Sequence, residues 1–366
     1  MSGPLRVLVV NAGSSSLKLR VLTGGRLAAT HDLPAGADGF DRDDLAVFLG
    51  DVRVDAVGHR VVHGGTRFTE PTRLDGDVVE ALEDLTDLAP LHQPKSLAGI
   101  DAVGAVLADV PAVACFDTAF HASLPAAAYT YALPQDWRDR WDVRRYGFHG
   151  LSHSYASGRA AELVDRPTGD LRVVVCHLGA GASLCAVDGG RSVDTTMGFT
   201  PLEGLVMATR SGSVDPGLVL WLQEHAGLSE HQVAEALEHR SGLLALGGSS
   251  DMRELLEQAA HGVDRAALAV DVYVHRLVAG VAAMAASLGG LDVLAFTGGV
   301  GENAAEIRAR AAGRLAFLGV EVGDRNVDAR GDADVSASGA PVRTVVVEAR
   351  EDLEISRGVE ALLASA

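Results

Sequence analysis

Cysteines and basic residues are scarce in this sequence of 366 residues. The three cysteines, Cys115, Cys176 and Cys185, lie within apolar segments and form no CxxC pair. This pattern predicts buried, reduced thiols rather than a disulfide framework or a zinc site. Lys and Arg number 31 against 49 Asp and Glu, and the net charge of −18 excludes a general attraction to nucleic acid or to an anionic membrane. Any anionic ligand therefore needs positive charge gathered at its own site.

The sequence also lacks a signal peptide, an uninterrupted membrane span and the common nucleotide motifs. Its start, MSGPLRVLVV, has neither the charged head nor the small-residue cleavage site of a signal peptide, so we expect a cytoplasmic protein. The longest apolar stretch, residues 267–288, contains Asp271, His275 and Arg276, which favours a buried amphipathic helix over a membrane span. Neither the P-loop pattern GxxxxGKS/T nor a strand-linked GxGxxG occurs.

Apolar residues, in contrast, are plentiful. The chain is 48% hydrophobic and 22% charged, and its mean hydropathy is +0.17, which is typical of a soluble globular protein large enough for two domains. Residues 5–26 and 171–191 both read as a strand, a small glycine-containing turn, a second strand and Gly-Gly-Arg. One explanation for this repeat is chance similarity between two β-hairpins. A duplicated fold would instead place the hairpins face to face across a cleft in which a nucleotide could lie.

Periodicity predicts the elements around these hairpins. An antiparallel meander is expected at the start of the chain, and the apolar positions 78, 82, 85 and 88 predict a helix that stops before Pro90. Ser250 or Asp251 is expected to cap a helix at its N-terminus. Helices are also expected over 217–227, 229–240, 264–290 and 304–319, with strands over 54–62, 111–117, 171–178 and 291–296.

Three glycine-rich turns and three cations indicate phosphate binding. NAGSSS, HLGAGAS and TGGVGEN each follow a strand, where free backbone N–H groups can approach a phosphate, although glycine can also serve only a tight corner. Lys18 follows the first turn and Arg210 lies in MATRSGSVDP, where a solvated charge is the alternative. Arg60 is flanked by Val57, Val61 and Val62, so its guanidinium needs a carboxylate or phosphoryl partner.

Carboxylates and histidines complete the candidate chemistry. Asp117 ends an apolar strand, a position that suits a Mg²⁺ ligand or a residue that orients a nucleophile, with structural capping as the alternative. Glu351 follows another strand-like run and could reach the same metal. His149, beside a glycine turn, is expected to donate to a transferring phosphoryl group. The HxxxH pairs at 59/63 and 149/153 lack HExxH character, so no zinc site is expected.

These motifs together resemble those of acetate kinases. NAGSSSLK, GHRVVHGG, FDTAFH, RYGFHGLSH, CHLGAGAS, MGFTPLEGL, TRSGSVDPG, SSDMR and FTGGVGEN occur in the family's order from about Val7 to Ile355. The resemblance implies an α/β fold of duplicated ribonuclease-H-like domains, as in actin, hexokinase and heat-shock-chaperone ATPases. The implied domains are 1–150 with about 353–366, and 151–352. It further implies a homodimer that transfers the γ-phosphoryl group of ATP reversibly to acetate with Mg²⁺, or with Mn²⁺ in its place.

The resemblance also assigns roles to residues of this chain. The catalytic group is Arg60, Asp117, His149 and Arg210. The acetate site is Arg60 with the apolar Val62, Leu91, Phe148 and Pro201. The metal ligands are Asn11 and Glu351, and His92 lies nearby in support. The nucleotide site is Asn11, Ser14, Ser16, Lys18, His177, Leu178, Gly179, Ala180, Gly181, Asp251, Met252, Arg253, Gly298, Gly299, Val300, Gly301, Glu302 and Asn303.

Four positions depart from the family pattern, and three other functions compete with the main interpretation. Ala180, Gln93 and Ser96 stand where the family commonly has asparagine, and Ser213 stands where it has aspartate. A propionate or butyrate kinase on the same scaffold differs by methylene groups that sequence cannot discriminate. A non-catalytic ATP-binding clamp predicts the loss of Arg60 and Arg210, and both are present. An acyl-phosphate or polyphosphate hydrolase would not need an apolar pocket beside the arginines.

Overall fold

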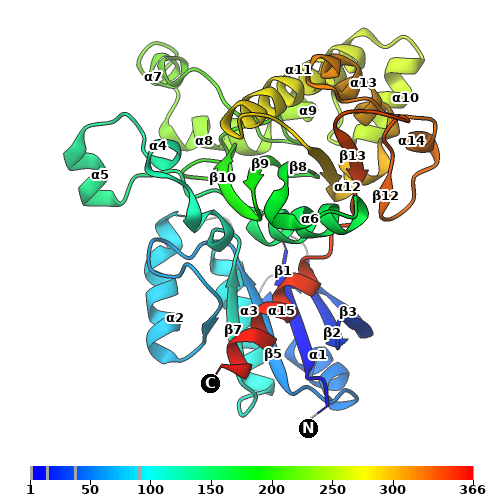
Figure 1. Cartoon of the computed structure of the whole chain (residues 1–366). Helices are drawn as coiled ribbons and strands as arrows, with labels where there is room; N and C mark the ends of the chain where they lie inside the picture. The colour runs from blue at the N-terminus through cyan, green and yellow to red at the C-terminus, as the bar shows by residue number, and fades with distance from the viewer. Residues whose placement is uncertain (1–2, 14–15, 37–38, 89–92, 366) are drawn as a thin grey trace. The chain divides into compact units, whose positions relative to one another are not determined.

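The chain forms two compact units, which are described here separately. The computed structural model describes residues 3–13, 16–36, 39–88 and 93–365 (Figure 1), so the predictions for Ser14, Leu91 and His92 lie outside the described residues. Unit 1 comprises residues 1–122, 148–155 and 350–366, and unit 2 comprises residues 123–147 and 156–349.

The boundaries of these units differ from the predicted domains at three places, one of which is residues 151–155, assigned from the sequence to the second domain but part of unit 1. Residues 123–147, assigned from the sequence to the first domain, are part of unit 2. Backbone hydrogen bonds explain this position, because the Tyr146 N–H donates to the Gly198 carbonyl at 3.0 Å. Residues 350–352, assigned to the second domain, begin the last segment of unit 1.

Unit 1 is built on a seven-stranded sheet with the order β4-β3-β2-β1-β5-β7-β6. The predicted antiparallel meander is present as β1, β2 and β3, and β5 and β7 extend the sheet parallel to β1. The turn between β1 and β2 is closed by the Gly13 N–H, which donates to the Ser16 carbonyl at 2.8 Å. The strands are β1 (Arg6–Ala12), β2 (Ser16–Thr23), β3 (Arg26–Gly36), β4 (Gly39–Phe40), β5 (Ala56–Val61), β6 (Thr72–Arg73) and β7 (Ala112–Phe116).

Helices cover both faces of this sheet, because the side chains of β1 and β5 alternate between two apolar layers. Leu8, Val10 and Val57 pack against α1 and α3 on one face. Val7, Val9 and Ala56 pack on the other face against α15, which Figure 1 shows in red beside β1 and β5. The helices are α1 (Arg42–Gly50), α2 (Gly76–Glu83), α3 (Gln93–Val106) and α15 (Glu351–Ala364), with short 3₁₀ turns η1 (Asp84–Leu88) and η2 (Ala119–Ser123).

Unit 2 repeats this topology. Its six-stranded sheet has the order β10-β9-β8-β11-β13-β12, in which β8, β9 and β10 form an antiparallel meander and β11 and β13 extend it parallel to β8. The strand order is therefore equivalent in the two units: β10-β9-β8-β11-β13 in unit 2 corresponds to β3-β2-β1-β5-β7 in unit 1. This equivalence confirms the duplication predicted from the two hairpins. The strands are β8 (Arg172–Leu178), β9 (Ala182–Asp188), β10 (Arg191–Thr195), β11 (Val293–Thr297), β12 (Ala333–Asp334) and β13 (Arg343–Val346).

Several helices of unit 2 begin with side-chain caps, one of them at the predicted residue Asp251. Asp251 caps α10 by accepting from the Arg253 N–H at 2.8 Å, and Ser229 and Gln232 form a capping box at α8. The helices are α4 (Ala126–Tyr129), α5 (Gln135–Trp141), α7 (Pro216–Glu224), α8 (Glu230–His239), α9 (Gly242–Gly247), α10 (Met252–Ala260), α11 (Asp264–Ser287), α12 (Gly298–Asn303), α13 (Ala305–Arg314) and α14 (Arg325–Asp328), with 3₁₀ turns η3 (Thr168–Asp170) and η4 (Ala316–Leu318). Helix α6 (Gly150–Leu163) begins in unit 1 and continues in unit 2.

Helix α11 is long and apolar enough to cross a membrane by length and composition alone. In the structure it packs against α9, α10 and β9 within unit 2. Val270, Val274 and Val281 are among its buried residues. These contacts agree with the predicted buried amphipathic helix, because a core helix of a soluble domain needs the same composition.

Candidate active site

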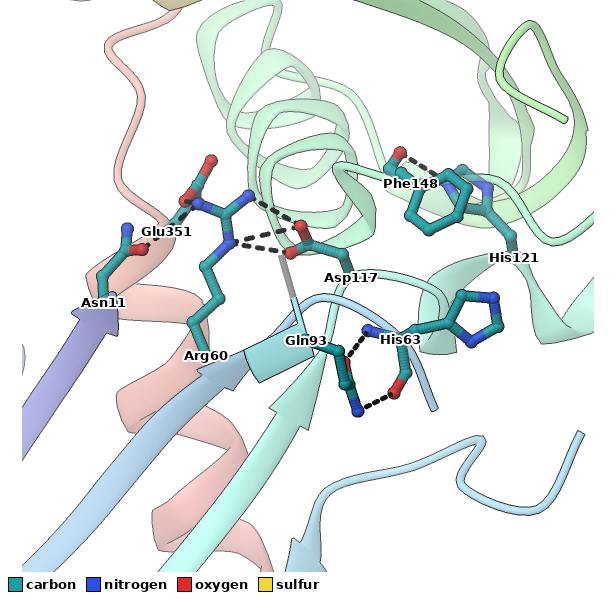
Figure 2. A network of polar contacts seen from close by, with 8 residues as sticks. All are labelled: Asn11, Arg60, His63, Gln93, Asp117, His121, Phe148 and Glu351. Atoms are coloured by element: carbon teal, nitrogen blue, oxygen red, sulfur yellow. Dashed lines mark hydrogen bonds and ion pairs between the residues drawn. The ribbon is translucent and has the colours of Figure 1, made fainter. Parts of the chain in front are cut away.

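Three polar side chains of unit 1 converge on the guanidinium of Arg60 (Figure 2). Arg60 Nε donates to Asp117 Oδ1 at 3.0 Å, and Nη2 donates to Asp117 Oδ2 at 2.6 Å. On the other side, Nη1 donates to Asn11 Oδ1 at 3.3 Å and lies 3.3 Å from Glu351 Oε2. Lys18 is the cross-strand neighbour of Asn11 in the β1–β2 pair. The carboxylate partner predicted for Arg60 is thus Asp117, bound through two guanidinium nitrogens.

The sheet topology explains why these residues meet. Asn11 lies near the end of β1, Arg60 near the end of β5, and Asp117 directly follows β7. These three strands are parallel, so their carboxyl ends share one edge of the sheet. Glu351 is the first residue of α15, the helix that packs on β1 and β5. The chain therefore assembles the cluster from four distant segments.

Burial and charge shift the pKa values of two members in a related way. Burial alone would lower the pKa of Arg60, but the charges of Asp117 and Glu351 and the Asp117 hydrogen bonds raise it above its ordinary value. Burial, together with the negative charge of Asp117, raises the pKa of Glu351 and outweighs the opposing effect of Arg60. Arg60 is therefore always charged and pairs mainly with Asp117. Glu351 is a desolvated carboxyl group, and a second cation would offset the cost of ionising it.

The loops beside this cluster are joined by buried hydrogen bonds, which Figure 2 shows in part. Gln93 Nε2 donates to the carbonyls of His63 and Leu82, each at 3.2 Å, and Gln93 Oε1 accepts from the His63 N–H at 3.3 Å. The Gly64 N–H donates to Thr118 Oγ1 at 3.1 Å. Gln93, which departs from the family pattern, therefore ties the loop after β5 to α3 and to the end of α2.

His149 and Phe148 are held beside Asp117 by contacts that sequence reasoning missed. His121 Nε2 donates to the Phe148 carbonyl at 3.0 Å (Figure 2), and the Gly150 N–H donates to the Asp117 carbonyl at 2.8 Å. A Cβ atom at position 150 would lie 2.2 Å from that carbonyl oxygen, so only glycine fits. His149 has a φ of 57°, a left-handed conformation that non-glycine residues seldom adopt away from functional sites.

The remaining predicted acetate and catalytic residues are divided between the units. Val62 is half-buried and Phe148 is buried in unit 1, whereas Pro201 and Arg210 belong to unit 2. The segment that bears Arg210 packs on Gly242, where a Cβ atom would lie 2.2 Å from the Met207 carbonyl oxygen. Burial lowers the pKa of Arg210, and the charge of Glu238 opposes this effect.

A second departure from the family pattern has a structural explanation in the same part of unit 2. Ser213 Oγ accepts from the Gly204 N–H at 3.0 Å, and the Ser213 N–H donates to the Gly204 carbonyl at 3.0 Å. Serine at position 213 therefore closes the segment that contains Leu205 and Arg210 without a carboxylate.

Unit 2 contains a cavity of about 660 Å³ where several predicted nucleotide residues meet. It lies between the turn after β8, the N-terminus of α10 and helix α12. The lining is mainly apolar, and Arg253 at its rim forms an ion pair with Asp251, Nη2 to Oδ2, at 2.7 Å. Eight predicted residues line it, namely Gly179, Ala180, Asp251, Met252, Arg253, Gly299, Val300 and Asn303, and four further residues were missed, namely Ala208, Leu243, Ser250 and Ala304.

Other predicted nucleotide residues lie outside this lining. Glu302 Oε1 accepts from the Ala349 N–H at 3.0 Å, so this side chain holds α12 to the segment that follows β13. Burial raises the Glu302 pKa. Gly298 has a φ of 77°, and a Cβ atom there would lie 2.9 Å from the Leu178 carbonyl oxygen. Leu178 is buried, and His177, Gly181 and Gly301 are also absent from the cavity lining. Asn11, Ser16 and Lys18 belong to unit 1.

The oxygen atoms around Arg60 suit a magnesium ion in their chemistry. Glu351, Asp117 and Asn11 supply carboxylate and amide oxygens, and Mg²⁺ usually takes one or two protein carboxylates together with water and phosphate oxygens. Within the described part of the chain, no group of three or more His, Cys, Asp and Glu side chains could hold a metal ion. The predicted ligands Asn11 and Glu351 therefore fit an ion shared with substrate phosphates, and their metal role stays a prediction.

Comparison with known proteins identifies the family. The model of the acetokinase family matches residues 43–357. An acetate kinase from Leifsonia xyli subsp. xyli is 48% identical, with 96% of this chain and 97% of that protein covered. A solved acetate kinase from Porphyromonas gingivalis is 35% identical with a TM-score of 0.89, covering 98% of this chain and 100% of that chain.

A solved propionate kinase from Francisella tularensis is equally similar in structure, with 33% identity, a TM-score of 0.89 and coverage of 98% of this chain and 99% of that chain. These matches and the repeated topology confirm the predicted α/β fold of two ribonuclease-H-like domains. The chain belongs to the acetokinase family.

Proposed function

We propose that this chain is a phosphotransferase that moves the γ-phosphoryl group of ATP to the carboxylate of acetate. The reaction gives acetyl phosphate and ADP, is reversible and depends on Mg²⁺. Membership of the acetokinase family supports the enzyme class. The observation that carries the proposal is the buried Arg60 cluster, because phosphoryl transfer is mainly a matter of positioning and charge neutralisation.

Arg60 is the group best placed to bind an anionic substrate in unit 1. Asp117 holds Nε and Nη2 at 2.6–3.0 Å, which fixes the plane of the guanidinium. Nη1 makes the longer contacts, 3.3 Å to both Asn11 and Glu351, so it is the part that an acetate or phosphoryl oxygen would engage. The acetate carboxylate already carries its attacking oxygen, so the reaction needs neither a covalent nucleophile nor a base to activate the acceptor.

His149, Arg210 and Glu351 have complementary roles in this proposal. His149 donates a hydrogen bond to the phosphoryl group in the transition state, and Arg210 of unit 2 neutralises its developing charge. Asn11 and Glu351 would hold Mg²⁺, which would supply positive charge to neutralise the phosphate oxygens. The raised pKa of Glu351 supports this assignment, because a divalent cation compensates the desolvation of its carboxylate.

The cavity of unit 2 is the proposed adenosine site. A mainly apolar lining of about 660 Å³ suits a nucleobase and ribose, with Asp251 and Arg253 as polar groups at the rim. Gly179, in the turn after β8, and Gly299, in α12, bring backbone to the same cavity without side chains in the way. Ala180, a departure from the family pattern, lines it without a side-chain amide.

Propionate is a second candidate acceptor, and the similarity to the Francisella tularensis propionate kinase favours considering it. The two acids differ by one methylene, which changes binding by about 1–3 kcal/mol. Val62, Phe148 and Pro201 are the residues predicted to contact the methyl group, and Val62 and Phe148 are those of unit 1.

The proposal includes a cytoplasmic homodimer whose ligands are acetate and ATP, with no nucleic acid or membrane partner. Trp137, Trp141, Leu220 and Trp221 of unit 2 are large apolar side chains about half exposed to solvent, which supports a subunit interface. The net charge of −18 supports the absence of polyanionic partners.

A hydroxamate assay, which traps acyl phosphate, tests the function. Purified protein is incubated with ATP and Mg²⁺ and with acetate, propionate or butyrate in turn, and ADP release without any acid is measured in parallel. We expect acyl hydroxamate from acetate, and a propionate signal that ranks the two acids by kcat/KM. ATP binding without acyl phosphate from any acid would support the non-catalytic clamp, and ADP release without an acid would support the hydrolase.

A further inference from the structure

A groove of about 700 Å³ opens in unit 1 on the face of the sheet opposite α15. Its walls are α2 and α3, and its floor is the face of β5 that carries Val57 and His59. The segment after α3, around Leu107, closes one end. None of the residues of the Arg60 cluster lines it, so the groove is distinct from the site described above. Its volume lies within the range of small-molecule sites.

His59 is a buried polar group directed into this groove. Its side chain is 2% exposed, and its ring makes no hydrogen bond with any residue of the described ranges. Burial lowers its pKa to about 3, so the imidazole is neutral at physiological pH and offers one donor and one acceptor nitrogen. A ligand in the groove could hydrogen-bond this imidazole in place of water.

The charges around the groove select the sign of that ligand. Asp75, Glu80, Glu83 and Asp109 line it against a single cation, Arg73, which gives the lining a net charge of −3. The C-terminal end of α3, where the helix dipole is negative, lies at the same end as Leu107. Phosphorylated and carboxylate metabolites are therefore disfavoured, and a cation with an apolar body is favoured.

Two glycines keep the groove open. A Cβ atom at Gly76 or Gly104 would meet no other atom within 4 Å, and both glycines line the groove. Gly104 lies inside α3, where glycine costs about 1 kcal/mol relative to alanine. Alanine would fit there sterically, so the absent side chain leaves space in the groove without relieving a clash.

From these observations we propose that the groove is an effector site for a small organic cation with an apolar body, which His59 recognises by a hydrogen bond. His59 and Arg60 are neighbours in β5 and point to opposite faces of the sheet. A ligand that displaces His59 therefore shifts the backbone that carries Arg60. The effector role rests on the proposed kinase function, whereas binding does not.

Binding is tested on the full chain with two probes of similar size and opposite charge, phenethylammonium and 3-phenylpropionate. Isothermal titration calorimetry measures affinity for wild type, His59→Phe, Gly104→Phe and the matched control Gly158→Phe, a helical glycine with no atom within 4 Å of its Cβ position. We expect the ammonium probe to bind wild type and Gly158→Phe at least about tenfold more tightly than it binds His59→Phe and Gly104→Phe. We also expect wild type to bind the ammonium probe at least about tenfold more tightly than the carboxylate probe.

The opposite results overturn the proposal. No saturable binding of phenethylammonium, equal affinity for the two probes, or full affinity in Gly104→Phe would each remove the cation site. Because His59→Phe could fail to fold, circular dichroism is recorded, and Gly104→Phe, which changes only an open position of α3, decides alone in that case. The initial rate of acyl hydroxamate formation should change by about twofold or more at saturating ammonium probe. Demonstrated binding with an unchanged rate would overturn the effector role, and absence of any acyl phosphate would point to failure of the proposed function instead.

Discussion

Replacing Arg60 by methionine tests whether the partly buried guanidinium serves turnover, stability or both. The substitution keeps an unbranched side chain and removes the charge. It deletes three contacts with Asp117, two of which are 2.6 Å and 3.0 Å long, one 3.3 Å hydrogen bond with Asn11 and one 3.3 Å ion pair with Glu351. Asp117 is 1% exposed, so its carboxylate loses its cation in a place where water cannot replace it.

The expected magnitudes follow from this geometry. Removing one member of a buried ion pair destabilises a protein by about 3–5 kcal/mol, because the other charge stays buried and unpaired. Loss of transition-state charge neutralisation lowers kcat by about 100-fold or more, equivalent to about 2.7–4 kcal/mol. The double variant Arg60→Met/Asp117→Asn also removes the charge of Asp117, the more deeply buried of the two carboxylates that Arg60 pairs with. It should regain at least half of the lost stability while turnover remains low.

Urea unfolding measures the stability change, and the hydroxamate assay with acetate measures kcat. The control is Arg172→Met, at the start of β8 in unit 2, whose guanidinium Nε donates to Asp292 Oδ2 at 2.9 Å. That ion pair is partly exposed, so its loss should cost about 1 kcal/mol or less and leave kcat unchanged. A kcat of Arg60→Met within about tenfold of wild type would refute the role of Arg60, and an equally unstable double variant would refute the unpaired-charge argument.

Three further outcomes are expected. Glu351→Gln should raise the Mg²⁺ concentration needed for half-maximal activity. Burial raises the Glu351 pKa above its ordinary value of 4.5, so ionisation of this carboxyl group destabilises the folded state. In urea titrations the variant should therefore gain stability relative to wild type as the pH rises from 4.5 to neutrality. Gly58→Ala should lower the unfolding free energy by about 1–3 kcal/mol, since its Cβ would lie 2.5 Å from Ile355 Cγ2, whereas an unchanged urea midpoint would contradict this packing. Burial raises the thiol pKa values of Cys115 and Cys185 to about 12, so a disulfide reagent should modify them only after unfolding, and rapid labelling of native protein would contradict their burial.

Local patterns in the sequence were sufficient for much of the fold and for the core of the site. The repeated hairpins predicted the duplication because alternation and Gly-Gly turns are properties of short segments. Arg60 and Asp117 could be singled out because each is a charge attached to an apolar strand. The domain boundary at residues 123–147 was not predictable, because that segment is assigned by hydrogen bonds to residues around Gly198.

Supporting residues were missed for a related reason. His121 and Gln93 carry no distinctive local pattern, yet each holds a backbone group of the site, the Phe148 carbonyl and the His63 peptide groups. Ala208 and Leu243 enter the nucleotide cavity as ordinary apolar residues. Glu302 was singled out from its motif, and its contact with the Ala349 N–H, 47 residues away, depends on the tertiary structure.

The sequence by itself determined the family, the repeated strand order and the identities of the charged groups, since these depend on residue types and spacing along the chain. Only the tertiary structure decided that Arg60 binds Asp117, 57 residues away, through two nitrogens and meets Glu351 through a third. It also decided that His59, next to Arg60, faces a separate acidic groove. Partners and burial depend on distances in space, and the packing of β1, β5, β7 and α15 sets those distances.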